Sequence, residues 1–499
     1  AGSMTVAPLV TRLTAEAYPK VKKNPDYKVP DSADVEYFRS FLSEDEMIQS
    51  KISEELINFN QDWRKEYRGH SNLVLLPNST EKVSKILKYC NDNKLAVVPQ
   101  GGNTCLVGAS VPVFDEIVLS LSNMNKVRDF DPVSGTLKCD AGVIMRDAHQ
   151  FLNQHDHIFP LDLPSRNKCQ VGGVVSTNAG GLNLLRYGSL HGNVLGLEVV
   201  LPNGQIVSSI NSLRKNNTGY DLKQLFIGAE GTIGVITGVS ILAAAKPKAL
   251  NAVFIGIDNF DTAQELFVKA KGELSEILSA FEFMDRGSIE HTIEYLKGYE
   301  FPLTKQHEFY LLVETSGSNH EHDYQKLSSY LSSALKSNLA TEGAIAKDRA
   351  EYDRIWTWRK SVPAACNSGI AQYQFDVSLP LKDLYTVPEA VIKRLKESNL
   401  VSNAPEPIID CVSFGHVGDG NIHLCIAKTE YARSIEDTLE RFVYEYLASK
   451  EGSISAEHGI GFHKKGCLHY SRSDIEISLM KDIKRHYDPN GILNPYKYI

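Results

Sequence analysis

The chain lacks several features that would point to common protein classes. No apolar run approaches the roughly 20 residues that a membrane-spanning helix needs. Its eight cysteines are scattered and form no CxxC pair, so reduced thiols are expected rather than disulfides or a cysteine-based zinc site. The net charge is −8, which argues against a nucleic-acid-binding surface. Neither a Walker A motif nor GxGxxG occurs, so the sequence does not indicate a P-loop or Rossmann nicotinamide site.

The N-terminal segment also lacks the pattern of an organelle-targeting peptide. It contains Glu16, Asp26 and Asp31 and has no arginine-rich amphipathic stretch, and Met4 can be a native start. We therefore expect a cytoplasmic protein, with the mitochondrial matrix as the less favoured alternative.

The length of 499 residues predicts two or three domains. A β-α-β unit is predicted from a strand over Asn72–Pro77, a helix capped by Asn78 and a strand over Leu95–Val98. The sequence pattern changes at Pro247, after which predicted helices and strands alternate. We expect a helix over Asp261–Gly272, capped by Asp261 and closed by Gly272, a strand over Phe309–Glu314, and C-terminal helices over Ser434–Lys450 and Asp474–His486. The predicted segments are 1–65, 66–247, 248–430 and 431–499.

The segment from Phe414 to Cys425 contains two histidines on either side of Asp419–Gly420, a dipeptide typical of hairpin turns. With a two-residue loop, His416 would face His423 directly, with Cβ atoms about 5 Å apart. Two such imidazoles can hold one metal ion, and Glu457 offers a third ligand. The alternative is two ordinary histidines beside a turn.

Three glycine-rich loops predict a long, anionic cofactor. They span Pro99–Ser110, Gly172–Gly181 and Gly228–Gly234. Loops of this kind let backbone N–H groups converge on an anion. One such loop can be an ordinary surface loop, whereas three in this order suggest a cofactor that is contacted at several points.

These loops, with Pro160–Pro164 and Arg186–Gly188, resemble the flavin-binding domain of the vanillyl-alcohol oxidase superfamily. Gly415–His423, Ser455–Gly461 and Asp488–Pro495 resemble the C-terminal half of its FAD-linked D-2-hydroxy acid dehydrogenases. Asn217–Phe226 and Ala280–Asp285 resemble the D-2-hydroxyglutarate branch. The resemblance runs from about Leu13 to the C-terminus.

The resemblance implies an α+β protein. Residues 66–247 would bind FAD, 248–430 would form a substrate (cap) domain with an antiparallel sheet, and the helical segment 431–499 would return to the flavin. His191 lies where some relatives attach flavin covalently, but this branch implies non-covalent FAD. The cofactor-binding residues that the resemblance implies are Pro99, Gly101, Gly102, Asn103, Thr104, Gly108, Ser110, Pro164, Gly172, Gly173, Asn178, Gly181, Tyr187, Gly188, Glu230, Gly231 and Asn494.

The resemblance also implies a catalytic site. A divalent metal, with zinc favoured, would be held by His416, His423 and Glu457, and it can lower the pKa of a substrate hydroxyl. His458 would take the proton, the alternative being that it only orients Glu457. Arg359 would bind the substrate carboxylate, the alternative being a surface arginine stacked between two tryptophans.

The substrate pocket departs from the branch pattern. Gln374 stands where lysine is usual, Cys425 where asparagine is usual, and Pro363 where some members have threonine. These are the expected substrate-binding positions, together with Arg359 and His458. The departures bear on recognition of a second carboxylate and leave the redox chemistry intact.

The predicted function is oxidation of D-2-hydroxyglutarate to 2-oxoglutarate, with pyruvate or a similar 2-oxo acid as electron acceptor. One alternative is a dehydrogenase of D-lactate or another monocarboxylic D-2-hydroxy acid. Another is a flavin-binding protein without catalysis. The expected partners are these small acids and a second copy of the chain in a homodimer, with no nucleic acid and no membrane span.

Overall fold

The computed structural model describes residues 21–366, 371–398, 408–428 and 433–499. The chain divides into two compact units. Unit 1 contains Leu182–Arg186 and Pro247–Ala456, and unit 2 contains residues 21–181, Tyr187–Lys246 and Glu457–Ile499. No helix in the described ranges is both long enough and apolar enough to cross a membrane.

Unit 2 is built on two sheets. The four-stranded sheet has the order β1-β2-β4-β3, in which β4 pairs in parallel with β2 and β3. The five-stranded sheet is antiparallel, with the order β5-β6-β10-β8-β9, and β7 pairs separately with β11. The strands are β1 Met47–Gln49, β2 Leu73–Leu75, β3 Val97–Gln100, β4 Ile117–Ser120, β5 Val127–Asp131, β6 Thr136–Asp140, β7 His157–Ile158, β8 Val194–Val200, β9 Ile206–Ser208, β10 Val235–Leu242 and β11 Ala244–Ala245.

The predicted β-α-β unit is confirmed as β2, α4 and β3, but its cap is not. Helix α4 (Thr80–Asp92) begins after Ser79, whose hydroxyl accepts from the Lys82 N–H at 3.3 Å, and not after Asn78. The other helices that contribute to this unit are α2 Ser32–Arg39, α3 Ile57–Asn60, α5 Met145–Asn153, α6 Val171–Ser176, α8 Leu190–Asn193 and α15 Asp474–Tyr487, while α7 Leu184–Tyr187 lies at the unit boundary.

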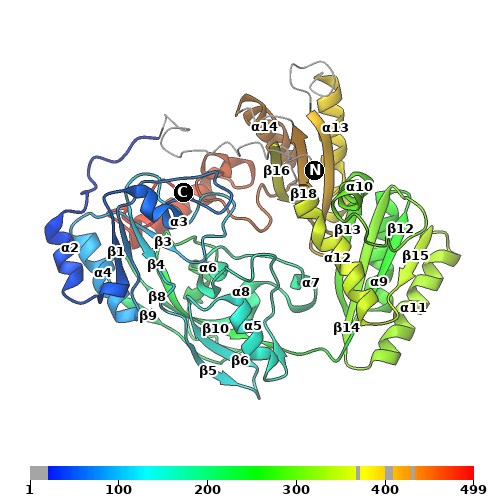
Figure 1. The fold of residues 1–499 in the computed structure, drawn as a ribbon, viewed down its shortest axis with the longest axis horizontal. Helices are drawn as coiled ribbons and strands as arrows, with labels where there is room; N and C mark the ends of the chain where they lie inside the picture. The colour runs from blue at the N-terminus through cyan, green and yellow to red at the C-terminus, as the bar shows by residue number, and fades with distance from the viewer. Residues whose placement is uncertain (1–20, 367–370, 399–407, 429–432) are drawn as a thin grey trace. The chain divides into compact units, whose positions relative to one another are not determined.

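Unit 1 is built on one antiparallel seven-stranded sheet with the order β15-β12-β14-β13-β17-β18-β16 (Figure 1). This confirms the predicted antiparallel sheet and the α+β class. Its strands are β12 Ala249–Ile257, β13 Leu278–Asp285, β14 Phe309–Gly317, β15 Glu342–Ile345, β16 Ala371–Ser378, β17 Ile408–His416 and β18 Asn421–Lys428, and its helices are α9 Phe260–Glu273, α10 Arg286–Tyr295, α11 His320–Lys336, α12 Arg349–Cys366, α13 Thr386–Glu397 and α14 Arg433–Ser449.

Strand β13 shows how the sheet separates its two faces. Phe281 and Phe283 contact aromatic rings of α9, at centroid distances of 5.0 Å to Phe267 and 5.3 Å to Phe260. The alternate residues Ala280 and Met284 pack into the apolar cluster formed with α10 and α12. Glu282 lies between them on this second face, because side chains alternate along a strand.

Helix α9 corrects two further predictions. It begins after Asn259, whose side-chain oxygen accepts from the Thr262 N–H at 2.9 Å, so Asp261 is inside the first turn. It also runs past Gly272 to Glu273. Asn259 takes the cap because its backbone is extended, with φ −152° and ψ 161°, which is the conformation a capping residue needs.

Candidate active site

The loop Pro99–Ser110 follows β3 and presents its backbone to an anion. In the described part of the chain, no hydrogen bond reaches the backbone N–H groups of residues 102–106. The Asn103 backbone is left-handed, with φ +52°, and its amide binds the Gln61 carbonyl oxygen at 2.7 Å. Ser110 donates to the Asn103 side-chain oxygen at 2.8 Å. These two side chains therefore shape the loop, while the backbone N–H groups fit a cofactor phosphate.

Close packing explains the glycines of the first two loops. A methyl group at Gly102 would lie 2.0 Å from the Lys168 carbonyl oxygen, and one at Gly172 would lie 2.4 Å from the Ala141 Cβ. Gly101 and Gly173 are less confined, with nearest neighbours at 3.4 and 4.0 Å. The two loops therefore combine glycines that permit close backbone contact with glycines at which an added Cβ would meet only ordinary van der Waals contacts.

The third loop is joined to the C-terminal tail. Asn494 donates to the carbonyl oxygens of Ala109 at 3.0 Å and Glu230 at 2.8 Å. The Lys497 ammonium donates to Ala109 at 3.1 Å and to the Asn494 side chain at 2.7 Å. The Gly228–Gly234 loop also needs left-handed backbone at Gly231, with φ +68°. One tail thus fixes the first and third loops together.

Glu230 is a buried carboxyl within this third loop. It accepts hydrogen bonds from the N–H groups of Ile460 and Gly461, both at 2.7 Å. Burial raises the pKa of Glu230 to about 7, although the two N–H donors oppose the rise.

His191, the candidate for covalent flavin attachment, is exposed, and its Nδ1 lies 2.5 Å from the Gln224 side-chain oxygen. The other implied flavin-contacting positions, Thr104, Gly108, Pro164, Asn178, Gly181, Tyr187 and Gly188, are also in unit 2.

The two histidines of the hairpin share a face, but their predicted register is wrong. His416 pairs with Asn421, and His423 pairs with Phe414. The loop has four residues, because Val417–Asp419 form a 3-10 turn that ends at left-handed Gly420. His416 and His423 are therefore diagonal neighbours, with ring centroids 5.6 Å apart.

A buried carboxylate lies between a histidine and an arginine. Glu282 Oε2 is 2.7 Å from His416 Nδ1 and 2.8 Å from an Arg359 terminal nitrogen. Burial alone would raise the pKa of Glu282, but the charges of His416 and Arg359 outweigh it and hold the pKa below its ordinary value. Glu282 is therefore ionised near neutral pH.

Arg359 is 4% exposed, which excludes the surface arginine considered above. It lies on α12 with its guanidinium carbon 5.2 Å from the centre of the Phe414 ring. Its Nε is buried and has no hydrogen-bond partner within the described ranges. A buried donor without a partner is costly, so this atom fits an acceptor supplied by a ligand.

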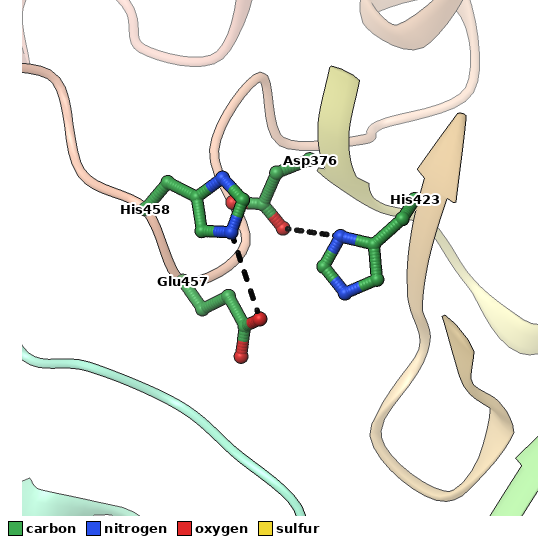
Figure 2. A group of neighbouring side chains, drawn as sticks. All are labelled: Asp376, His423, Glu457 and His458. Atoms are coloured by element: carbon green, nitrogen blue, oxygen red, sulfur yellow. Dashed lines mark ion pairs between the residues drawn. The ribbon is translucent and has the colours of Figure 1, made fainter. Parts of the chain in front are cut away.

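Four side chains gather near the start of the Glu457 segment (Figure 2). Asp376, His423, Glu457 and His458 each offer one ligand atom, and these atoms all lie within 4.8 Å of one another. Chain connectivity helps to bring them together, because the Ala456 N–H, just before Glu457, donates to the Asp376 carbonyl oxygen at 3.3 Å.

The carboxylates turn both histidines in a similar way. His423 Nδ1 lies 3.7 Å from Asp376 Oδ1 (Figure 2). In the same way, His416 Nδ1 faces Glu282 at 2.7 Å. Histidine metal ligands usually present the other ring nitrogen to a carboxylate, so this donor set fits a metal held through Nε2. The predicted ligand His416 is not one of the four grouped residues; it adjoins them through His423.

The substrate-specificity positions lie on the same sheet and on α12. Gln374 on β16 pairs directly with Cys425 on β18, and Cys425 is 4% exposed. Pro363 lies within α12, one turn beyond Arg359.

Sequence reasoning missed Glu282 and Asp376. Glu282 lies within Ala280–Asp285, one of the segments that carry the family resemblance, and Asp376 follows Gln374 by two residues on β16; both carboxylates are buried. A charge at such a position needs a buried partner, and that was the available signal.

Comparisons with known proteins agree with this architecture. The family model described as the C-terminal domain of FAD linked oxidases matches residues 246–498, and the FAD binding domain matches residues 71–209. The D-2-hydroxyglutarate–pyruvate transhydrogenase DLD3 of Saccharomyces cerevisiae is 75% identical, over 99% of this chain and 100% of that protein. The mitochondrial D-2-hydroxyglutarate dehydrogenase of Arabidopsis thaliana is 44% identical, over 96% and 84%.

Solved structures resemble the fold at low sequence identity. An alkyldihydroxyacetonephosphate synthase has a TM-score of 0.70 at 17% identity, covering 96% of this chain and 88% of that one. A p-cresol methylhydroxylase also has a TM-score of 0.70 at 17% identity, covering 93% and 95%. The predicted vanillyl-alcohol oxidase-type fold is confirmed, and the chain belongs to the FAD-linked oxidases, with an FAD-binding domain followed by the C-terminal domain of that family.

Proposed function

We propose that the protein oxidises D-2-hydroxy acids, principally D-2-hydroxyglutarate to 2-oxoglutarate, and passes the electrons to pyruvate or a similar 2-oxo acid. The observation that carries the proposal is the buried Arg359 guanidinium, whose Nε has no hydrogen-bond partner among the described residues and lies on the sheet face that holds His416. A planar guanidinium suits a carboxylate, the group that all 2-hydroxy acids share. The 75% identity to a D-2-hydroxyglutarate–pyruvate transhydrogenase supports the choice of substrate and acceptor.

The flavin would be held by the glycine-rich loops of unit 2. The N–H groups of residues 102–106 would bind its phosphates, and Asn494 would keep the first and third loops together. Bound FAD supplies the acceptance of two electrons from the substrate. We expect dissociable FAD, because His191 is exposed and already faces Gln224. Denatured protein should release its yellow colour into the supernatant, whereas a yellow pellet would indicate covalent attachment.

A divalent metal, with zinc preferred, would be held by His416, His423 and Glu457. The support is the pair of carboxylates, Glu282 and Asp376, that face the Nδ1 atoms of the two histidines. Such a metal would supply Lewis acidity that lowers the pKa of a substrate hydroxyl. Asp376 is an additional candidate ligand, because it belongs to the group in Figure 2.

His458 would remove the hydroxyl proton while Arg359 binds the carboxylate. The alternative role, in which His458 only orients Glu457, is less well supported because His458 Nε2 lies 3.8 Å from Glu457 Oε1. That separation exceeds a hydrogen bond. Imidazole suits proton transfer near neutral pH.

A D-lactate dehydrogenase is the second candidate, and the Gln374–Cys425 pair favours it. These two residues face each other across β16 and β18 and carry no positive charge. A distal carboxylate would gain weaker binding there than from lysine and asparagine.

The test is anaerobic bleaching of the flavin with D- and L-2-hydroxy acids. Bleaching by D-2-hydroxyglutarate, followed by rapid reoxidation on adding pyruvate, is the expected result. Bleaching by D-lactate alone would favour the second candidate. No bleaching by any hydroxy acid would indicate a flavin protein without this activity, and fast reoxidation only by a quinone would indicate a respiratory acceptor.

The cytoplasmic location and the homodimer remain part of the proposal. Cell fractionation and light scattering of the purified protein would test them.

A further inference from the structure

Glu282 occupies an unusual position on the sheet of unit 1. It is 2% exposed, and its strand neighbours on the same face, Ala280 and Met284, are apolar and buried. Across the sheet it pairs directly with His416 on β17. An isolated carboxylate in such surroundings would be strongly destabilising, so Glu282 must be retained for its partners.

A single oxygen of Glu282 serves two groups from different elements. Oε2 lies 2.8 Å from Arg359, which comes from α12, and 2.7 Å from His416 Nδ1, which comes from β17. Arg359 and His416 are both buried, with 4% and 7% of their surfaces exposed. Because both lie against the same carboxylate oxygen, that oxygen is placed to set the distance between them.

This arrangement matters because the two groups would bind different parts of one substrate. Arg359 would bind the carboxylate, and the metal ligand His416 would help to position the neighbouring hydroxyl. Those substrate groups are attached to the same carbon, so a small change in the separation of their binding groups misplaces one of them.

We propose that Glu282 is a positioning residue that holds Arg359 and His416 at the separation required by a 2-hydroxy carboxylate. The inference rests on the proposed function and extends it to a residue outside the predicted site. A carboxylate beside Nδ1 favours the proton on that nitrogen, which would leave His416 Nε2 for the metal, and its charge would also hold the guanidinium in place.

The structure provides a matched control in Glu314. This carboxyl lies on the adjacent strand β14 and is half-buried beneath α12, where it accepts from Trp356 Nε1 at 2.8 Å and from Ser279 at 2.6 Å. Among the described residues, Glu314 forms no hydrogen bond or ion pair with Arg359 or with His416. Glu314→Gln removes a half-buried carboxyl from the same region without touching the proposed bridge.

The experiment compares Glu282→Gln, Glu282→Asp and Glu314→Gln, each purified with FAD. Three quantities are measured: the FAD-to-protein ratio, the zinc dissociation constant by competition with a chelator, and KM with kcat for D-2-hydroxyglutarate at saturating zinc. We expect Glu282→Gln to keep FAD, to weaken zinc binding roughly 10–100-fold and to raise KM about tenfold. Glu314→Gln should keep zinc affinity and KM within about twofold of wild type, because the Glu282 bridge stays intact.

Glu282→Asp covers the case in which the glutamine variant fails to fold. It keeps the buried charge but withdraws the carboxylate by one methylene, so we expect weaker zinc binding and a higher KM in folded, FAD-loaded protein. Wild-type values in both measurements for Glu282→Asp, or a change in only one of them, would overturn the bridge. Equal effects of Glu314→Gln would likewise overturn it, because they would show a general response to losing a carboxyl beneath α12.

The wild-type arm separates this inference from the proposed function. Wild-type protein that binds no zinc or oxidises no 2-hydroxy acid would refute the proposed function and with it the role of Glu282. A wild-type enzyme that behaves as proposed, beside unchanged Glu282 variants, would refute the role of Glu282 alone.

Discussion

The two units prepare their binding sites by different physical means. In unit 2 the glycine-rich loops depend on their backbone. They offer the N–H groups of residues 102–106, they contain glycines confined by neighbouring carbonyl groups, and side chains such as Asn494 bind their carbonyl oxygens. In unit 1 the site uses ionisable side chains with little exposure to water, namely Glu282, Arg359 and the two hairpin histidines. A backbone site should be sensitive to added volume and tolerant of lost charge, whereas a charged site should show the reverse.

The largest expected effect is in unit 1. His416→Ala should lower kcat on the order of 10³-fold if His416 is the metal ligand proposed above, because losing that ligand would remove several kcal/mol of charge stabilisation. Flavin absorbance should stay at the wild-type level, because the substitution lies outside unit 2. Stopped-flow bleaching with metal analysis measures both. Full turnover by wild-type protein shown to be metal-free would contradict this prediction.

The next effect concerns pH, and it compares a buried carboxyl from each unit. Burial raises the pKa of Glu230 in unit 2 and of Asp285 in unit 1 to about 7. The folded state then binds the proton more tightly than the unfolded chain. The stabilisation is fully present below about pH 4 and is lost as the pH rises through about 7, by roughly 3 kcal/mol for Glu230 and roughly 4 kcal/mol for Asp285.

Glu230→Gln should therefore flatten the pH dependence of unit 2, and Asp285→Asn that of unit 1. Asparagine can still cap α10, which Asp285 begins by accepting from the Ser288 N–H at 2.8 Å. Urea unfolding between pH 5 and 8 would follow unit 2 by flavin fluorescence and unit 1 mainly by Trp356 and Trp358. A steeper pH dependence of the unfolding free energy in either variant would contradict the raised pKa of the carboxyl that it replaces.

A smaller effect is expected when side-chain volume is added to a glycine-rich loop of unit 2. Gly102→Ala would place a methyl group 2.0 Å from the Lys168 carbonyl oxygen, so the loop must shift. We expect a loss of about 1–3 kcal/mol in stability and a lower FAD-to-protein ratio. Gly192→Ala is the control in the same unit, because a Cβ there meets nothing within 4 Å. Normal FAD content in Gly102→Ala would show that the loop is not confined.

The smallest effect concerns specificity within unit 1. Gln374→Lys with Cys425→Asn should raise the preference for D-2-hydroxyglutarate over D-lactate about tenfold in kcat/KM, because it supplies charge and an amide for the distal carboxylate. Cys425→Asn alone separates the amide from the charge. An unchanged ratio in the double variant, or a wild-type preference for the diacid of several orders of magnitude, would exclude this explanation.

The sequence predicted the fold and the clustering of motifs better than it predicted local geometry. The glycine loops, the β-α-β unit and the shared face of the hairpin histidines were accessible because they depend on spacing and residue type. The hairpin register was not, since Asp419–Gly420 also fits a longer turn in which only Gly420 is left-handed. The caps at Ser79 and Asn259 were missed because adjacent residues, Asn78 and Asp261, have equally good capping side chains.

Glu282 and Asp376 show a different limit. Their roles depend on which residues lie opposite them on β17 and β18. The order of strands in a seven-stranded sheet cannot be predicted from the residues of one strand alone. The alternation pattern reveals that an acid is buried, but only the pairing reveals its partner.

The contacts of Asn494 and Lys497 have a consequence for biosynthesis. These residues join the first and third glycine-rich loops, yet they leave the ribosome after every other element of unit 2 described above. The two loops are made before the residues that join them, and they remain unjoined until residue 494 has been synthesised. Stable capture of FAD is therefore expected to be a late event, and a nascent chain halted before residue 494 should hold the cofactor poorly even though its glycine-rich loops are all present.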